Sequence, residues 1–187
     1  MAPESFIGWS DEIECESGSV IVANVADFAH WSGAPAHAGH EAVHPFEPGC
    51  ACYLWRVLPG SVSISVDSGR AALWLAQIEY AEDDAGRKAA YAYALAYDGA
   101  QQAPGLLYRV GAGPVVIAWA ANSVKNTSTA IERLPLSGAS AGALIDFAGG
   151  PNAAAVWLEP GVYASSLFFH EDDQWGVSWC KLQRVSD

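Results

Sequence analysis

The feature that most constrains the fold is an alternation of apolar residues with small or polar ones. Residues 61–66, SVSISV, place Val62, Ile64 and Val66 on one face of an extended segment and serines on the other. Residues 89–97, AAYAYALAY, alternate in the same way, with tyrosine and leucine against alanine. A period of two predicts β-strands that are half buried against a core.

Further short apolar segments predict more strands of the same kind. Gly, Pro, Ser, Asn and Asp separate them, as tight turns require. The additional predicted strands are 19–25, 52–58, 72–80, 106–110, 114–120, 142–147, 154–158, 162–169 and 176–184. Outside residues 34–44, nothing indicates a helix with caps. Many short strands at close spacing predict an all-β fold, an antiparallel β-sandwich.

Two parts of the chain resemble each other and predict two pseudo-repeated halves. Residues 18–23, GSVIVA, echo 113–118, GPVVIA, and residues 71–75, AALWL, echo 154–158, AAVWL. This pattern indicates a duplication of about 90 residues, with one half at 1–100 and the other at 101–187. The first half is the longer one, and its extra residues fall at about 30–52, a His- and Cys-rich insertion. The alternative is one continuous domain, since any chain of short strands repeats its turns.

The charge of the chain is strongly negative. Asp and Glu number 21 and Lys and Arg 9, which gives a net charge of −12. Such a surface repels nucleic acid and membrane phosphates. It attracts a basic partner, for example a protein that itself binds nucleic acid. The alternative is that the acids only keep the protein soluble.

Two acidic clusters are candidates for binding that partner. Each follows a Trp-Leu pair and a strand, so both are predicted at the tips of equivalent hairpins. Because Trp and Tyr dominate interface hot spots, Trp175 beside the second cluster is the candidate apolar anchor. The predicted partner-binding residues are Glu82, Asp83, Asp84, Glu171, Asp172, Asp173 and Trp175. The alternative is that these acids only keep the tips of the hairpins solvated.

The string His40-Glu41-Ala42-Val43-His44 matches the H-E-x-x-H motif of zinc proteases. In those enzymes the motif lies within a helix, so that both His side chains meet the metal and Glu activates its water. Pro45 follows His44 directly and disfavours a helix there. Cys50 stands where a third ligand would come. His40, His44 and Cys50 are therefore candidate zinc ligands, and an ordinary loop without metal is the alternative.

Other features limit the classes of function. There is no G-x-S-x-G elbow and no phosphate-binding loop, so no catalytic residue is predicted. No apolar run approaches the roughly 20 residues of a membrane helix, and the N-terminus has no signal-peptide pattern. Cys15, Cys50, Cys52 and Cys180 are then expected to be reduced thiols in a cytoplasmic protein.

Two stretches resemble the ComJ-type competence nuclease inhibitors. Trp9-Ser10-Asp11-Glu12 followed by Gly18-Ser19-Val20 is similar to the opening of that family. Residues 131–136, residues 155–169 and the end of the last strand, Leu182-Gln183-Arg184-Val185, are similar to its closing strands. The run from Leu158 to Tyr163, in which a Pro-Gly turn delivers a Tyr into a strand, is the most telling part, and small bacterial immunity proteins have related motifs. The resemblance implies a β-sandwich protein that binds and blocks a nuclease.

Three classes of function follow. The first is an acidic cytoplasmic protein that inhibits a basic enzyme, a nuclease or a toxin, by binding it without a cofactor. The second is a zinc-dependent hydrolase that uses the HEAVH string. The third is a β-sandwich module for a small ligand or a sugar, which requires exposed aromatic side chains in a cleft.

Overall fold

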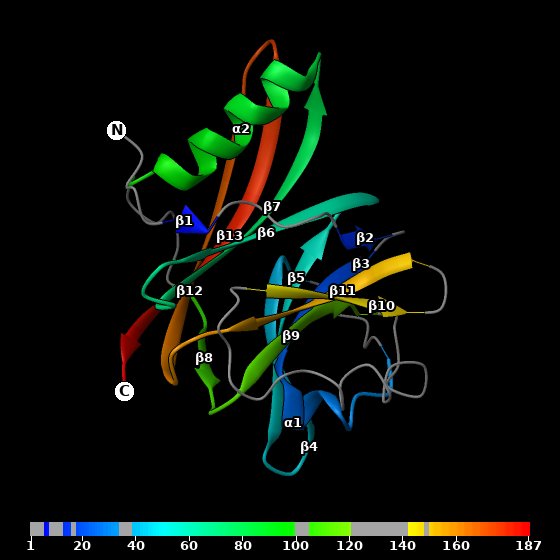
Figure 1. Cartoon of the computed structure of the whole chain (residues 1–187), viewed down its shortest axis with the longest axis vertical. Helices are drawn as coiled ribbons and strands as arrows, with labels where there is room; N and C mark the ends of the chain where they lie inside the picture. The colour runs from blue at the N-terminus through cyan, green and yellow to red at the C-terminus, as the bar shows by residue number, and fades with distance from the viewer. Residues whose placement is uncertain are drawn as a thin grey trace.

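The computed structural model describes residues 6–7, 13–15, 18–33, 39–99, 105–120, 142–147 and 150–187. These residues form two antiparallel sheets and two helices (Figure 1). The predicted all-β fold, an antiparallel sandwich, is confirmed. The segments 9–12 and 131–136 of the family resemblance lie outside the described residues.

Each sheet is assembled from strands that are far apart in the sequence. The first sheet has the order β1 (Phe6–Ile7), β6 (Gly60–Asp67), β7 (Ala72–Ala81), β13 (Trp175–Ser186), β12 (Gly161–Glu171) and β8 (Leu107–Val110), and β2 (Ile13–Cys15) also pairs with β6. The second sheet has the order β10 (Gly142–Phe147), β11 (Gly150–Trp157), β9 (Pro114–Trp119), β3 (Gly18–Asn24), β5 (Cys50–Val57) and β4 (Glu41–Glu47).

The main core lies between the two sheets. Val62, Ile64 and Val66 of β6 face it, as their alternation predicts, and Val20 and Val22 of β3 face it from the second sheet. The same cluster includes side chains of β9, β11, β12 and β13. Both halves of the chain therefore contribute to one sandwich.

Residues 89–96 lie in a helix, so the strand predicted at 89–97 is wrong. Helix α2 (Asp84–Ala96) crosses the outer face of the first sheet, over β7 and β13 (Figure 1). It begins where the Oδ1 atom of Asp83 accepts the backbone N–H of Gly86 at 2.8 Å, a typical N-cap. Its many alanines favour the helix further.

The buried face of α2 explains why the sequence pattern of residues 89–97 also fitted a strand. Ala90 and Ala94 are fully buried, and Tyr93 and Tyr97 pack on the same cluster. The positions 90, 93, 94 and 97 form a helical stripe of the i, i+3, i+4, i+7 type. The same nine letters satisfy this stripe and a period of two, so the pattern alone did not decide between helix and strand.

The outer face of the second sheet carries helix α1 (Val25–Phe28). Phe28 and Trp31 are buried there against β3, β5 and β9. The indole N–H of Trp31 donates to the carbonyl oxygen of Ala120 at 3.1 Å. Residues 41–52, which the sequence placed in an insertion, form β4 and the start of β5 and so belong to this sheet.

In each sheet, the strands from the first half of the chain and those from the second half are arranged in the same order outward from the centre. In the second sheet β3 and β9 are central, and the hairpins β4–β5 and β10–β11 flank them on opposite sides. In the first sheet β7 and β13 are central, β6 and β12 flank them, and β1 and β8 lie at the edges. A duplicated half would give this order, although duplication of the sequence itself stays a prediction.

The topology changes one detail of the predicted repeat. Trp74 lies in β7 and Trp157 in β11, which belong to different sheets, so these two tryptophans do not occupy equivalent places. Trp55 of β5 corresponds to Trp157 instead. Both strands lead into a turn with a glycine at positive φ, 145° at Gly60 and 155° at Gly161.

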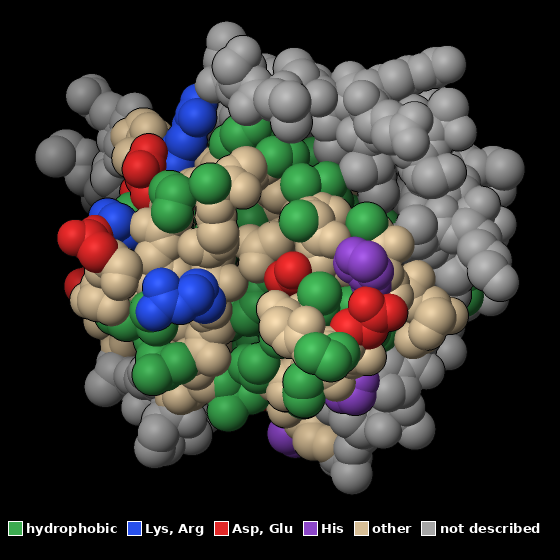
Figure 2. All heavy atoms as spheres, turned by 90° about the horizontal axis from the view of Figure 1, so that it is seen from below, with side chains coloured by type: hydrophobic (Ala, Val, Ile, Leu, Met, Phe, Trp, Pro, Cys, Tyr) green, Lys and Arg blue, Asp and Glu red, His purple; other side chains and the backbone are tan. Residues whose placement is uncertain are grey.

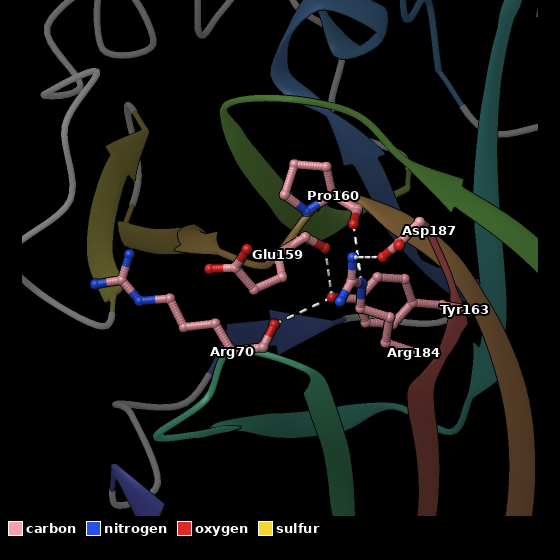
Figure 3. A network of polar contacts seen from close by, with 6 residues as sticks. All are labelled: Arg70, Glu159, Pro160, Tyr163, Arg184 and Asp187. Carbon is pink, nitrogen blue, oxygen red and sulfur yellow. Dashed lines mark hydrogen bonds and ion pairs between the residues drawn. The ribbon is translucent and has the colours of Figure 1, made fainter.

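A polar network closes the edge of the sandwich near the C-terminus (Figure 3). The hydroxyl of Tyr163, which is fully buried, lies 2.7 Å from the carbonyl oxygen of Glu159 and 3.0 Å from that of Arg70. The backbone N–H of Glu159 donates to the same oxygen of Arg70 at 2.8 Å. The tyrosine after the Pro-Gly turn thus joins the β6–β7 turn to the β11–β12 turn.

Candidate functional site

The two acidic clusters lie side by side at one end of the first sheet. β7 and β13 pair antiparallel, with Trp175 opposite Ala81, so the end of β7 meets the start of β13. The backbone N–H of Glu82 donates to the carbonyl oxygen of Gln174 at 3.1 Å. We call residues 79–84 and 171–174 together the acidic end.

The sequence predicted that the two clusters occupy equivalent hairpins, and this prediction is wrong. Residues 171–174 form the β12–β13 turn, whereas residues 82–84 lead from β7 into helix α2. Their proximity comes from strand pairing and not from symmetry. The side chains of Glu82, Asp83, Asp84, Glu171, Asp172 and Asp173 are all exposed.

Two of these carboxylates shape the local backbone. Asp83 caps α2. The Oδ1 atom of Asp172 accepts the backbone N–H groups of Gln174 and Trp175 at 2.8 and 2.9 Å. These two bonds, aided by His170, hold the pKa of Asp172 below its usual value. Glu82, Asp84, Glu171 and Asp173 therefore remain as the better candidates for contact with a partner.

Tyr80 adds an aromatic ring to the acidic end. Its ring lies against Gly176, where a Cβ atom would come 2.7 Å from the ring, so a glycine is needed there. The hydroxyl donates to the carbonyl oxygen of Asp172 and ties β7 to the β12–β13 turn. Partial desolvation and the charges of Glu171 and its neighbours raise the pKa of Tyr80. Tyr80 as a whole is 39% exposed.

The predicted apolar anchor is not on the surface. Trp175 is only 7% exposed and packs against Tyr93 and His170 beneath helix α2, with ring centroids 5.5 and 4.8 Å apart. It points to the opposite face of the sheet from Glu171. Trp175 therefore belongs to the core under the helix, and an exposed anchor must come from other residues.

A cleft of about 510 Å³ adjoins the acidic end. Gln77, Ser178 and Phe169 are register partners on β7, β13 and β12, so their side chains share one face of the first sheet. The same face of the first sheet packs against the second sheet in the main core. The cleft is lined by His40, Trp55, Arg56, Val57, Leu58, Gln77, Glu79, Leu167, Phe168, Phe169 and Ser178.

The cleft has two exposed apolar side chains on backbone that is held by hydrogen bonds. Leu58 is 56% exposed and Phe169 is 52% exposed. The buried amide of Gln77 accepts the N–H of Leu58 at 2.9 Å and donates to its carbonyl oxygen at 2.7 Å. The sequence analysis missed these residues. Alternation shows which face of its strand Phe169 lies on, but it does not show that the second sheet ends before covering that position.

Residues 41–44 of the HEAVH string form the start of strand β4, directly after His40, and the string is not helical. In a strand, residues four apart lie about 13 Å from each other, so His40 and His44 cannot share one metal ion as they do on a helix. His40 lines the cleft, whereas His44 lies beside Trp31, with ring centroids 6.4 Å apart. The Glu41 carboxylate accepts the hydroxyl of Tyr53 at 2.5 Å. The geometry of a zinc protease is therefore absent from this segment.

Cys50 has different neighbours from those predicted. His30, Glu47 and Cys50 form a group whose potential ligand atoms all lie within 4.8 Å of one another. They lie at the end of the molecule that carries α1 and β4, where Figure 2 shows histidine side chains beside acidic ones. Partial desolvation and the carboxylates of Asp27 and Glu47 raise the pKa of Cys50.

The other three cysteines are buried, and all four are free thiols. Burial raises the pKa of Cys15 and Cys52 to about 12 and also raises that of Cys180, so none of these three is a reactive thiolate. Among the described residues, no helix has the length and apolar character needed to cross a membrane.

Comparisons of the chain with protein-family models, with curated proteins and with solved structures found no match. The resemblance to the competence nuclease inhibitors therefore rests on the sequence motifs alone.

Proposed function

We propose that this protein binds a basic protein through its acidic end and the adjoining cleft, and so blocks the activity of that partner. The observation that carries the proposal is the contact between the two acidic turns. Glu82 and Gln174 are joined by a backbone hydrogen bond, which concentrates acids from distant parts of the sequence on one surface.

The charge of this surface favours a basic partner. The acids that it gathers are Glu79, Glu82, Asp83, Asp84, Glu171, Asp172 and Asp173, and Arg87 and Lys88 follow on α2. A cluster of like charges steers an oppositely charged protein and speeds association. Nucleases hold phosphates on basic surfaces, so such a surface competes for the site of the nucleic acid. The sequence motifs support a nuclease or a toxin as the partner.

Apolar contacts beside the acids supply the remaining free energy of binding. Tyr80, Phe169 and Leu58 are the exposed large side chains of the acidic end and the cleft. An apolar centre with a charged rim is the usual anatomy of a protein interface. Gln77 holds the backbone of Leu58 and strand pairing holds that of Phe169, so little backbone entropy is lost on binding.

The cleft supports one second candidate function, the binding of a small ligand or a sugar. Its exposed Phe169, beside Gln77 and Arg56, meets the requirement for an aromatic side chain in a cleft with polar neighbours. A hydrolase is not proposed, because the HEAVH string lies in a strand.

Inhibition of purified basic nucleases tests the proposal. We expect at least one nuclease in a panel to be inhibited at low salt, with an affinity that falls steeply between about 0.01 and 1 M salt. Glu82→Gln/Glu171→Gln/Asp173→Asn should weaken that inhibition. Asp98→Asn/Glu159→Gln/Asp187→Asn is the matched control, since it removes three exposed acids away from the acidic end. Equal loss in both variants would contradict the proposed surface, and binding of a glycan array instead would favour the second candidate.

A further inference from the structure

His30, Glu47 and Cys50 are brought together by two separate elements. The turn that follows α1 holds His30, whose backbone N–H donates to the carbonyl oxygen of Asp27 at 3.0 Å. Glu47 and Cys50 flank the β4–β5 turn, in which Gly49 has a φ of 83°. The Nδ1 atom of His30 lies 3.1 Å from the Oε2 atom of Glu47.

These three side chains offer the nitrogen, oxygen and sulfur ligands that Zn²⁺ takes in proteins. Bond lengths of 2.0–2.3 Å in a tetrahedral site place neighbouring ligand atoms about 3.3–3.8 Å apart. The candidate ligand atoms lie within 4.8 Å of one another, and His30 and Glu47 are exposed. Small rotations of surface side chains therefore suffice to close the site.

Asp27 supports the same geometry from α1. Its carboxylate accepts the side-chain amide of Asn24 at 3.0 Å and lies near enough to Cys50 to raise the pKa of that thiol. Metal-binding side chains commonly have such a partner that holds them in orientation. The group offers three ligand atoms, so the fourth position of a tetrahedral site is left to water.

We infer that His30, Glu47 and Cys50 bind one Zn²⁺ ion, which clamps the end of α1 to the β4–β5 hairpin. This site uses none of the histidines of the HEAVH string. It is independent of the proposed partner surface, because the group lies at the α1 end of the molecule and the acidic end lies at the far end of β7 (Figure 1).

Titration of the tag-free, full-length protein with Co²⁺ and then Zn²⁺ tests this inference. We expect one equivalent of Co²⁺ to bind with the sulfur-to-cobalt charge-transfer band of a thiolate ligand, and Zn²⁺ to displace it. Cys50→Ser should abolish that band. Loss of a supporting partner alone costs 10–100-fold in affinity, so His30→Ala and Glu47→Gln should each weaken binding by at least about tenfold.

The double variant His40→Ala/His44→Ala is the matched control and should bind Co²⁺ like the wild type. Zn²⁺ should raise the Tm of the wild type and of this control, but not that of Cys50→Ser. Circular dichroism without metal verifies that each variant is folded. The inference is overturned if no thiolate band develops, if the band survives Cys50→Ser, or if the control loses it.

Discussion

The backbone N–H of Glu82 donates to the carbonyl oxygen of Gln174 at 3.1 Å, although the two residues are far apart in the chain. This bond exists because β7 and β13 pair antiparallel at the centre of the first sheet. The acids around Glu82 and those before Gln174 therefore form one surface. A partner that binds this surface would contact the charges of both turns together.

The turn carboxylate of Asp172 should make stability depend on pH. Its pKa is lowered in the folded protein by the N–H groups of Gln174 and Trp175. A carboxylate whose pKa is lower in the folded protein stabilises it at a pH above the pKa of the unfolded chain, about 3.9 for Asp. That stabilisation is lost as the pH falls through the pKa of the folded protein. Urea unfolding at falling pH should show this loss in the wild type and a smaller one in Asp172→Asn.

The control for this prediction is Asp173→Asn, which removes the same charge one residue along. That variant keeps both N–H bonds to Asp172. It should lose stability with acid as the wild type does. Identical acid profiles for the wild type and Asp172→Asn would show that the turn bonds do not contribute.

Phe168 and Phe169 offer a matched pair, since neighbouring residues of a strand face opposite sides. Phe168 packs on Trp179 beneath α2, with ring centroids 5.2 Å apart, whereas Phe169 is exposed in the cleft. Phe168→Ser should lower the free energy of unfolding by about 1–3 kcal/mol, less than the loss of a fully buried ring, because Phe168 is only partly buried. Phe169→Ser should change it by less than about 0.5 kcal/mol and weaken partner binding instead. Comparable destabilisation by the two substitutions would mean that Phe169 is part of the core.

Tyr163→Phe tests the network that closes the sandwich edge. The substitution removes the hydroxyl that lies close to the carbonyl oxygens of Glu159 and Arg70 and leaves the ring in place. We expect a loss of about 1–2 kcal/mol in the free energy of unfolding, measured with urea. Tyr93→Phe serves as the comparison, because Tyr93 acts mainly through ring packing on Trp175 and His170. A Tyr163→Phe protein as stable as the wild type would contradict the role of the network.

The strand pattern was predictable from the sequence where the two faces of a strand carry different types of residue. Val62, Ile64 and Val66 are such a case, and β6 forms there with these three side chains in the main core. The expectation that β6 is only half buried was wrong, because Ser63 and Ser65 on its other face are also buried, and the Oγ atom of Ser63 lies 2.6 Å from the hydroxyl of Tyr91 on α2. The same logic failed for residues 89–97, because alanine fits a helix and a strand alike. The N-cap Asp83 and the stripe through Ala90 and Ala94 were the signals that distinguish the helix.

The candidate site was only partly predictable. The acidic residues could be named from composition, but their contact depends on the pairing of β7 with β13, which sequence pattern does not specify. Trp175 was expected outside because it borders a charged turn, yet α2 covers it. Cys50 was grouped with His40 and His44 on helical spacing, whereas a strand separates those two histidines and His30 comes from another element.

The central claim, that the acidic end binds a basic partner, is tested most directly by quantitative affinity capture with three baits. The baits are the wild type, Glu82→Gln/Glu171→Gln/Asp173→Asn, and the control Asp98→Asn/Glu159→Gln/Asp187→Asn. Lysate of the source cells is applied at low salt, and the captured proteins are quantified by mass spectrometry. We predict that a basic nuclease or toxin is retained by the wild type and the control and lost from the first variant. Equal retention by all three baits, or capture of no basic protein, would contradict the claim.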